Sequence, residues 1–324
     1  MENLPIIVIT GPTASGKTDL GAALGVALGG EVISADSMQI YRGMDVGTAK
    51  VTAAEARGVP HHMIDVADPA EDFSVGRFTD MAAPIVRDIL ARGKTAILAG
   101  GTGLYMDALV LGRSFAPYPA TGKREALEAL ADREGIEAVQ AMLRQFDPAA
   151  AARLHPGDRR RIIRAVEVYQ ETGMTITEHD RLSKLVPPQF RPVWIGLNYV
   201  NREDLYRRID ARVDAMLAAG LEQELDRLLA AGVPENATSM QAIGYKELLR
   251  ERRGEITREQ AFDDIKRGSR NYAKRQLTWL RRNPDVHWIG LGADPDFEEV
   301  YRQAGRILLD AGFPGAREIF SGST

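Results

Sequence analysis

The sequence predicts an α/β fold in which a parallel sheet is flanked by helices and the chain carries a helical insertion domain. Residues 6–9 are four consecutive apolar residues, mostly β-branched, as expected for a strand buried on both faces. A glycine-rich turn follows this run, and an apolar stripe with helical spacing follows the turn. Strand and helix patterns then alternate to about residue 100, which is typical of parallel strands joined by covering helices.

The individual elements follow from local apolar patterns and from residues that begin or end helices. We expect strands at residues 5–10, 31–35, 95–99 and 193–197, and helices at residues 19–28 and 78–92. Gly29 and Gly30 end the first of these helices, because glycine readily adopts the left-handed conformation that follows a helix. Residues 123–183 show only helical patterns, and Asn201 begins a further helical region as an N-cap residue.

Prolines divide the chain into an α/β core and an inserted segment. Two prolines precede the helical stretch and three follow it. We therefore assign residues 1–117 and 191–314 to the core with its C-terminal helices, and residues 118–190 to the helical insertion domain. Residues 315–324 are expected to form a flexible tail.

Composition excludes several classes of chemistry. The 324 residues contain no cysteine, which rules out disulfides, thiolate catalysis, iron–sulfur clusters and cysteine-bound zinc. Apolar runs such as residues 6–9 are too short to cross a membrane, and no signal-peptide pattern follows Met1. We therefore expect a cytoplasmic protein without membrane contact, and we take a monomer as the default.

Basic residues are concentrated in two segments of an otherwise acidic chain. The whole chain has 41 Lys and Arg against 45 Asp and Glu, a net charge of −4. Residues 153–164 have a net charge of +4 and residues 266–282 of +7, so the remainder is strongly acidic. Such segments attract a polyanion such as a nucleic acid, but solvated helix faces explain them equally well at this point.

A phosphate-binding pattern, G-x-x-x-x-G-K-[ST], lies between the first strand and the first helix. It consists of Gly11, Pro12, Thr13, Ala14, Ser15, Gly16, Lys17 and Thr18. Its glycines let backbone N–H groups point inward, where they and the helix N-terminus surround a phosphate. Lys17 adds a positive charge, and the Thr18 hydroxyl is a ligand for Mg²⁺. The pattern makes the predicted sheet P-loop NTPase-like without specifying a reaction.

An acidic residue and a glycine-rich segment follow the next two strands. Asp36 ends the second strand, and residues 100–102 follow the third. Because the carboxyl ends of parallel strands meet at one edge, both are expected near the phosphate-binding loop. From position alone, Asp36 fits a general base, a metal ligand or a turn residue, and Thr102 a hydrogen-bond donor or a helix cap. The missing Asp after the third strand disfavours an ATPase but leaves a small-molecule kinase open.

With these residues assembled, the chain resembles the tRNA dimethylallyltransferase family, also called tRNA isopentenyltransferases or IPP transferases. The matching segments are residues 11–18, 34–37, 40–50, 60–65, 100–105, 158–167, 244–245 and 273–279. They occur in family order over roughly residues 5–283, and those at 40–50 and 274–279 are not general features of phosphate-binding loops.

The resemblance implies a transferase that moves a dimethylallyl group from dimethylallyl diphosphate to N6 of the adenosine immediately 3′ of the anticodon in tRNA. The phosphate-binding loop, commonly described as an ATP site, would hold the diphosphate together with Mg²⁺ at Thr18. This agrees with the missing Asp after the third strand, because no phosphoryl group is transferred. The implied partner is the tRNA anticodon stem-loop, with no obligate protein partner.

The resemblance also assigns roles to residues. It implies that Asp36 takes the proton from the adenine N6, and that Thr102 contacts tRNA or a diphosphate oxygen. It places Arg208 near the diphosphate, and Arg212 shares a helix face with Arg208. The implied tRNA-binding residues are Asp36, Ser37, Met38, Gln39, Thr102, Arg124, Arg160, Arg161, Ile162, Ile163, Arg164, Met240, Gln241, Ala242, Ile243, Gly244, Tyr245, Lys274, Arg275, Gln276, Leu277, Thr278, Trp279 and Arg281. The target base would have to leave its stack to reach Asp36.

Alternative functions and structural explanations stay open. A prenyltransferase acting on free AMP, ADP or ATP would share the loop but would not need the basic segments, and a small-molecule kinase is the third hypothesis. His61 and His62 could form a metal pair, although adjacent histidines are more often structural. Trp194, Trp279 and Trp288 are expected to be packing residues.

Overall fold

The computed structural model describes residues 4–113 and 121–321, and the chain divides into two compact units. One unit is formed by Met1–Leu111 with Pro188–Thr324, and the other by Gly112–Pro187. The expected boundary between residues 117 and 118 lies outside the described residues. The first unit holds the sheet, whereas the described part of the second contains helices without strands.

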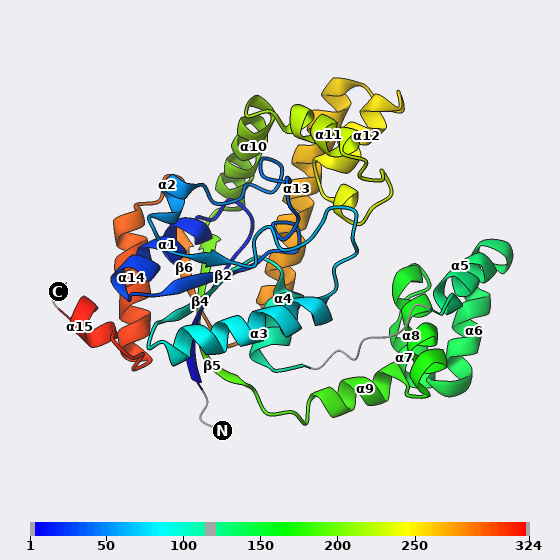
Figure 1. Ribbon diagram of the computed structural model, residues 1–324, viewed down its shortest axis with the longest axis horizontal. Helices are drawn as coiled ribbons and strands as arrows, with labels where there is room; N and C mark the ends of the chain where they lie inside the picture. The colour runs from blue at the N-terminus through cyan, green and yellow to red at the C-terminus, as the bar shows by residue number, and fades with distance from the viewer. Residues whose placement is uncertain (1–3, 114–120, 322–324) are drawn as a thin grey trace. The chain divides into compact units, whose positions relative to one another are not determined.

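A six-stranded parallel sheet forms the centre of the first unit (Figure 1). The strands are β1 (Leu4–Thr10), β2 (Glu31–Ala35), β3 (His61–His62), β4 (Ala96–Gly100), β5 (Phe190–Tyr199) and β6 (Val286–Leu291), in the order β3-β2-β4-β1-β5-β6. Central β1 pairs with both neighbours, so that Ile7 lies beside Ile97 and Val193. Since all these pairings are parallel, the carboxyl ends of the strands meet at one edge, where residues 11–16 leave β1.

The first unit contains helices that cover both faces of this sheet and helices that lie beside it. They are α1 (Lys17–Ala27), α2 (Ala53–Ala56), α3 (Val75–Ala91), α4 (Gly103–Val110), α10 (Arg202–Ala218), α11 (Leu221–Ala230), η1 (Ser239–Gln241), α12 (Tyr245–Arg252), α13 (Arg258–Leu280), α14 (Phe297–Asp310) and α15 (Ala316–Phe320). Ile7 and Ile9 belong to a hydrophobic core shared with α1, α10 and α14. Ile6 and Val8 belong to a second core shared with α3 and α4. Burial on both faces explains the unbroken apolar run of β1, and the predicted α/β fold is confirmed.

Two strands escaped prediction for physical reasons. β3 is only two residues long, too short for any pattern to be visible. β6 lies at the edge of the sheet and exposes His287 and Trp288, so its apolar pattern is interrupted. Trp288 is 38% exposed, but its indole packs on Gly196 of β5, where an added Cβ would come within 2.6 Å of Cε3, and Trp194 is buried, so both are packing residues as expected.

A third hydrophobic core lies beside the sheet and joins distant parts of the chain. It combines Ile40, Tyr41 and Met44 with side chains from α10, α11, α12 and α13. Tyr41 and Tyr245 are among its largest fully buried side chains. This core packs the segment after β2 against helices that follow it by about 200 residues.

The second unit is a small helical body with its own core. Its helices are α5 (Lys123–Glu134), α6 (Ile136–Phe146), α7 (Pro148–Arg153), α8 (Arg159–Thr172) and α9 (Ile176–Ser183). Leu143 and Val139 of α6 pack on Ile162 and Val166 of α8 in one core, and Asp147 caps α7 through the N–H of Ala150.

The end of the chain differs from the expected flexible tail. Residues 316–320 form α15, whose Ala316 and Phe320 are buried. The Phe320 ring packs on Gly305, where an added Cβ would come within 2.4 Å of Cδ1. The prediction of a loose segment is therefore wrong for α15, and residues 322–324 lie outside the described part of the chain. Among the described helices, none is long and apolar enough to cross a membrane.

Candidate active site

The glycine-rich loop between β1 and α1 is closed tightly against its neighbours. Gly11 has φ +151°, and an added Cβ would lie 2.4 Å from the carbonyl oxygen of Leu197. Gly16 has φ +81°, and an added Cβ would lie 2.1 Å from the Phe297 ring. Both positions therefore require glycine, on conformational and on steric grounds. The loop leads directly into Lys17, the first residue of α1, where the backbone N–H groups have no acceptor within the helix.

Lys17 lies half-buried at the base of this loop. Its Nζ donates a hydrogen bond to the carbonyl oxygen of Pro12 at 2.6 Å. Burial and the nearby Arg212 guanidinium lower the pKa of Lys17 to about 7, although Asp36 acts in the opposite direction. Two half-buried cations that repel one another form a site where an anion is favoured.

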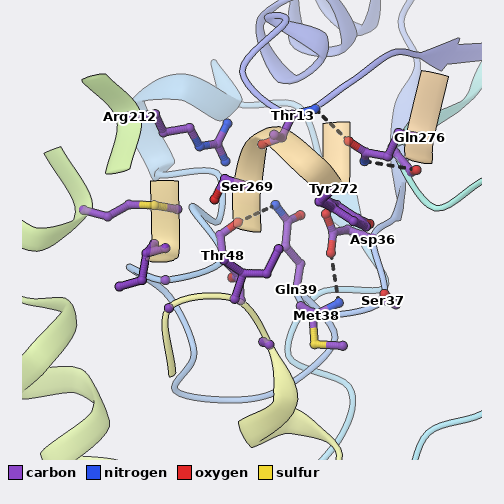
Figure 2. Close-up of a pocket in the computed structure, with 18 of the residues that line it drawn as sticks. Thr13, Asp36, Ser37, Met38, Gln39, Thr48, Arg212, Ser269, Tyr272 and Gln276 are labelled. Carbon is purple, nitrogen blue, oxygen red and sulfur yellow. Dashed lines mark hydrogen bonds between the residues drawn. The ribbon is translucent and has the colours of Figure 1, made fainter. Parts of the chain in front are cut away.

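Arg212 of α10 is the second of these cations. Burial lowers the pKa of its guanidinium, and its Nε has no hydrogen-bond partner among the described residues. Figure 2 shows the guanidinium pointing into the cavity toward Thr13. Arg208, one turn earlier, is exposed and does not line the cavity, so the structure brings Arg212 rather than Arg208 to this site.

A cavity of about 300 Å³ extends from the loop past the carboxyl ends of the strands. Its lining combines the loop and α1 (Thr13, Lys17, Thr18), the end of β2 (Ser34, Asp36, Ser37, Met38, Gln39), residues 47–48, residues 99–101, α10 (Arg212, Met216), Leu221 of α11, the segment of residues 241–244 with Lys246, and α13 (Ile265, Ser269, Tyr272, Arg275, Gln276). Figure 2 shows Arg212 and Asp36 entering it from opposite sides. The cavity thus has a cationic end and an end that carries a carboxylate.

Asp36 is held at the point where the chain leaves β2. Its Oδ1 accepts the N–H of Met38 at 2.9 Å, an Asx-type turn that fixes the carboxylate (Figure 2). Thr102, from the end of β4, accepts the N–H of Ser37 with Oγ1 at 3.1 Å. Thr102 makes no side-chain capping bond to α4, so its hydroxyl orients the turn after Asp36 instead. Thr102 itself does not line the cavity.

Two residues of α13 complete the surroundings of Asp36. The Tyr272 ring lies beside Asp36 in Figure 2, and burial together with the charge of Asp36 raises the pKa of Tyr272 to about 12. Its phenol is therefore protonated at neutral pH. Gln276, one turn later, accepts the N–H of Thr13 at 2.9 Å and donates to the carbonyl oxygen of Gly101 at 3.1 Å. Gln276 thus fastens the glycine-rich loop to the end of β4.

Burial corrects part of the predicted RNA-contact set. The side chains of Ile162 and Ile163 belong to the core of the second unit, and those of Met240 and Tyr245 to the third core of the first. All four are at most 2% exposed, so they cannot contact an RNA directly. Sequence spacing could not separate them from their neighbours, because the motifs that carry them mix exposed and core-facing positions.

The remaining members of that set divide between the cavity and the surface. Residues 37–39, residues 241–244, Arg275 and Gln276 line the cavity. Arg124, Arg160, Arg161, Lys274, Thr278 and Arg281 are exposed, Arg164 and Leu277 are half-buried, and Trp279 donates its Nε1 hydrogen to Asp107 at 2.8 Å. The Trp279 ring also packs on Gly103, where an added Cβ would come within 2.1 Å of Cδ1, as expected for a packing residue, and its tRNA contact stays a prediction.

Ion pairs neutralise part of the positive charge of the two basic segments. In residues 153–164, Arg153, Arg159, Arg161 and Arg164 pair with carboxylates, and in residues 266–282 Lys266, Arg267 and Arg270 do the same. Within the described chain, Arg160, Lys274, Arg275, Arg281 and Arg282 have no carboxylate partner. The positive charge available to a polyanion is thus smaller than the net charge counted from the sequence. Most of it lies at the C-terminal end of α13 and directly after it.

The adjacent histidines have structural partners. His62 Nε2 lies 2.8 Å from Oε2 of Glu31, and His61 Nδ1 lies 2.9 Å from the carbonyl oxygen of Val59. Across residues 4–113 and 121–321, no group of three or more His, Asp or Glu side chains is arranged to hold a metal.

Comparison with known proteins identifies the family. Residues 39–283 match the family model described as IPP transferase, and residues 4–70 match one described as isopentenyl transferase. The chain belongs to the IPP transferase family. This IPP transferase is 44% identical in sequence to a tRNA dimethylallyltransferase of Caldanaerobacter subterraneus, and the match covers 92% of this chain and 95% of the relative. It is 47% identical to one from Symbiobacterium thermophilum, over 89% of this chain and 90% of the relative.

Solved IPP transferases have the same fold. The tRNA isopentenylpyrophosphate transferase of Bacillus halodurans superposes with a TM-score of 0.71 at 42% identity, covering 98% of both chains. A eukaryotic dimethylallyltransferase acting on tRNA superposes with a TM-score of 0.79 at 28% identity, over 95% of this chain and 80% of the other.

Proposed function

We propose that this protein transfers the dimethylallyl group of dimethylallyl diphosphate to N6 of the adenosine immediately 3′ of the anticodon in tRNA. Its near-full-length similarity to tRNA dimethylallyltransferases supports this activity. The observation that carries the proposal is a single cavity with the half-buried cations Lys17 and Arg212 at one end and Asp36 at the other. Such a cavity suits a reaction in which an anion departs at one end while an amine loses a proton at the other.

The glycine-rich loop is the proposed site of the donor diphosphate, as in P-loop nucleotide sites. The inward N–H groups at the start of α1, with Lys17 and Arg212, would stabilise the negative charge that grows on the diphosphate as the allylic C–O bond breaks. Formation of the diphosphate complex would restore full charge on Lys17, because an adjacent anion favours the ammonium form.

Magnesium fits this donor site in a limited way. The Thr18 side chain lines the cavity next to Lys17 and offers one oxygen ligand, so most other ligands would come from the diphosphate and water. When bound, Mg²⁺ would neutralise charge on the leaving diphosphate. Thr18 is thus the residue expected to hold the ion.

Asp36 is the proposed general base. As the adenine N6 lone pair forms a bond to the allylic carbon, the C–O bond to the diphosphate breaks, and the N6 proton passes to the Asp36 carboxylate. The N–H of Met38 and the Thr102-held turn keep this carboxylate in place. Tyr272 lies beside it and presents an aromatic face on which a purine could stack.

The acceptor RNA would be held by the cavity mouth and by exposed basic residues. Residues 37–39 and 241–244 line the cavity, and Lys274, Arg275 and Arg281 of the α13 region remain available for phosphates. Arg124, Arg160 and Arg161 of the helical insertion are the further proposed contacts. The target base would enter unstacked, because a walled cavity cannot admit a base within its helix. A cytoplasmic location, a monomeric state and independence of a protein partner remain predictions.

A transfer assay tests the proposal directly. The enzyme is incubated with labelled dimethylallyl diphosphate and either an unmodified tRNA transcript with adenosine 3′ of its anticodon or free AMP. We expect label in the tRNA and none in a matched transcript with guanosine at that position. Label in AMP alone would favour an adenylate prenyltransferase, and phosphate transfer from ATP without prenyl transfer would favour a kinase.

A further inference from the structure

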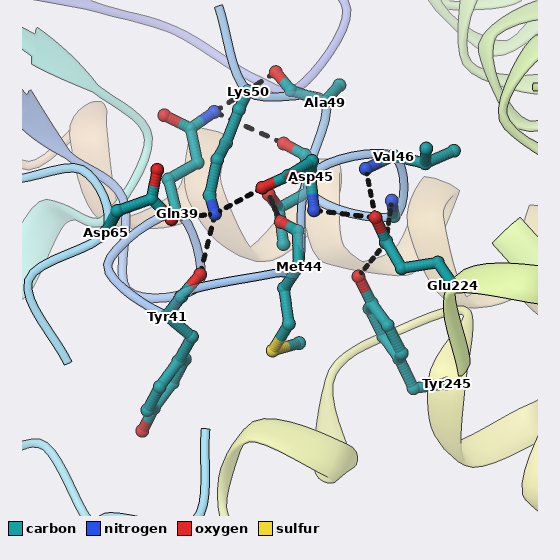
Figure 3. Close-up of polar contacts among 12 residues, drawn as sticks. Gln39, Tyr41, Met44, Asp45, Val46, Ala49, Lys50, Asp65, Glu224 and Tyr245 are labelled. Atoms are coloured by element: carbon teal, nitrogen blue, oxygen red, sulfur yellow. Dashed lines mark hydrogen bonds and ion pairs between the residues drawn. The ribbon is translucent and has the colours of Figure 1, made fainter. Parts of the chain in front are cut away.

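A buried carboxylate outside the cavity lining holds a turn by its backbone. Glu224 of α11 is 1% exposed. Its Oε2 accepts the N–H groups of Asp45 and Val46, both at 2.8 Å, and its Oε1 accepts the N–H of Gly47 at 2.9 Å (Figure 3). The hydroxyl of Tyr245 donates to the same Oε1 at 2.6 Å. Four donors thus converge on one carboxylate, for which no ion pair is found within residues 4–113 and 121–321.

These four donors come from two different walls of the cavity. Gly47 lines the cavity together with Thr48, while Tyr245 directly follows the lining segment 241–244. The two walls meet closely, since a Cβ on Gly47 would come within 2.5 Å of the Tyr245 hydroxyl oxygen. Glu224 therefore ties the loop after β2 to the start of α12.

The position of this loop in turn determines the orientation of Gln39. Its Nε2 donates to the carbonyl oxygens of Thr48 and Ala49 at 3.2 and 3.3 Å, and its Oε1 accepts the Ser34 hydroxyl at 2.9 Å. Figure 2 shows the Gln39 amide within the cavity. A shift of residues 45–49 would therefore move the Gln39 amide, which lies three residues after Asp36.

Lys50 closes the loop from its other end. Its Nζ contacts Asp45 Oδ1 at 2.7 Å, Asp65 Oδ1 at 2.5 Å and the carbonyl oxygen of Tyr41 at 2.6 Å (Figure 3). Lys50 thereby connects residues 41, 45 and 65, which are close in the sequence. Glu224, in contrast, connects the turn to α11 and Tyr245. The loop is thus a defined structure that packs on the third core and is hydrogen-bonded to the opposite wall through Glu224.

We propose that Glu224 is a positioning residue for the acceptor: it sets the spacing between the loop of residues 38–48 and the segment 241–245, and through it the orientation of Gln39. The proposal rests on the proposed function, in which this part of the cavity receives the adenosine. It predicts that Glu224 governs use of tRNA and leaves the donor site, which lies at the glycine-rich loop, unaffected.

Glu224→Gln tests this role with little change in shape. In glutamine, one of the two accepting oxygens is replaced by an NH₂ group, which cannot accept a hydrogen bond. This NH₂ group must therefore face the donors that one carboxylate oxygen of Glu224 accepts. We expect kcat/KM for a tRNA transcript to fall about tenfold, since small misplacements of reacting groups have large kinetic effects. The KM for dimethylallyl diphosphate should stay within about twofold of wild type. Glu222→Gln is the matched control, because Glu222 lies on the same helix but pairs with Arg258 at 2.6 Å, and it should behave as wild type.

A double-mutant cycle with Gln39→Ala separates positioning from general loss of structure. If Glu224 acts through Gln39, Glu224→Gln should cost clearly less activity in the Gln39→Ala background than in the wild type. Should Glu224→Gln fail to fold, Tyr245→Phe removes one of the four donors alone and should lower kcat/KM for tRNA about threefold, donor KM unchanged.

The outcomes are distinct. If the wild-type protein modifies no tRNA, the proposed function itself is contradicted, and with it the inference that rests on it. If the wild-type protein is active and Glu224→Gln has the same kcat/KM for tRNA as Glu222→Gln, the inference is overturned. It is also overturned if the effects of Glu224→Gln and Gln39→Ala on kcat/KM are additive, or if Glu224→Gln impairs the use of donor and of tRNA equally.

Discussion

The donor end and the acceptor end of the cavity are assembled in different ways. At the donor end, residues 11–18 form one continuous loop whose glycines leave no room for a side chain. At the acceptor end, Asp36, Gln39, Tyr272 and residues 241–244 come from separate parts of the chain, and the segment after β2 is held by Thr102 and Glu224, which lie 65 and 179 positions from their partners Ser37 and Asp45. In the proposed function, a local backbone structure would present amides to a phosphate, whereas contacts between distant parts of the chain would shape the space for a base. Changes at the two ends should therefore affect different kinetic parameters.

The largest expected effect is at the acceptor end. Asp36→Asn keeps the shape of the side chain and removes its basicity, so we expect kcat to fall about a thousandfold. Donor binding should be unchanged, because the cations at the loop are intact. Single-turnover transfer and equilibrium binding of a donor analogue measure the two effects, with the exposed Asp68→Asn as control. Near-normal turnover would mean that another group takes the proton.

The second effect is at the donor end and uses two arginines on one helix. Arg212→Gln removes a half-buried cation that faces the cavity, and we expect the KM for dimethylallyl diphosphate to rise about 30-fold. Arg208→Gln, one turn away and exposed, should change it less than about twofold. Steady-state kinetics at saturating tRNA decide between them. A larger effect for Arg208→Gln would contradict this placement of the donor.

A smaller effect concerns pH at the donor end. The pKa of Lys17 is about 7 before the donor binds, and the bound diphosphate must raise it. Below pH 7 the lysine is already charged, so it adds no pH dependence. Above pH 7 binding takes up a proton, and donor affinity should fall by at most about tenfold per pH unit. Calorimetry in buffers of different ionisation enthalpy measures the proton uptake. Lys17→Arg should abolish it, and an unchanged uptake in that variant would assign the proton elsewhere.

The smallest effect on activity is expected outside the cavity. Glu31 begins β2, is 3% exposed, and bonds Arg92, Lys94 and His62. The bonds from Arg92, with those from Lys94 and His62, hold the pKa of Glu31 well below its ordinary 4.5. Its stabilisation is therefore complete above pH 4.5 and lost as pH falls further.

Glu31→Gln should accordingly lower Tm at pH 7 by about 5 °C and leave kcat/KM unchanged, because Asp36 lies at the other end of β2. Thermal unfolding at pH 7 and below pH 4 measures this, and the difference from wild type should shrink at the lower pH. An unchanged Tm at pH 7 would show that the cluster adds no stability.

The contrast between the two ends also explains what the sequence could predict. Residues 11–18 and Asp36 were identified because a loop motif is contiguous and because parallel strands place their carboxyl ends together. Arg212 and Tyr272 were not assigned to the site, since nothing local distinguishes a cavity-facing position from an exposed one on the same helix. Glu224 bonds residues almost 180 positions earlier in the chain, a contact that no local pattern predicts.

Burial sets a second limit on prediction from motifs. Ile162 and Ile163 stand between arginines in the matching segment, yet their side chains fill the core of the second unit. A family motif records which residues occur together, whether they contact a ligand or support the residues that do. Only the folded structure separates these two roles.

The central claim is that one cavity holds the diphosphate at the glycine-rich loop and the adenine at Asp36. A crystal structure with a non-reactive dimethylallyl diphosphate analogue and an anticodon stem-loop tests it most directly. We predict diphosphate oxygens bonded to the N–H groups at the start of α1 and to Arg212, with the adenine N6 within hydrogen-bond distance of the Asp36 carboxylate. An adenine bound away from Asp36, or a diphosphate bound outside the loop, would contradict the account.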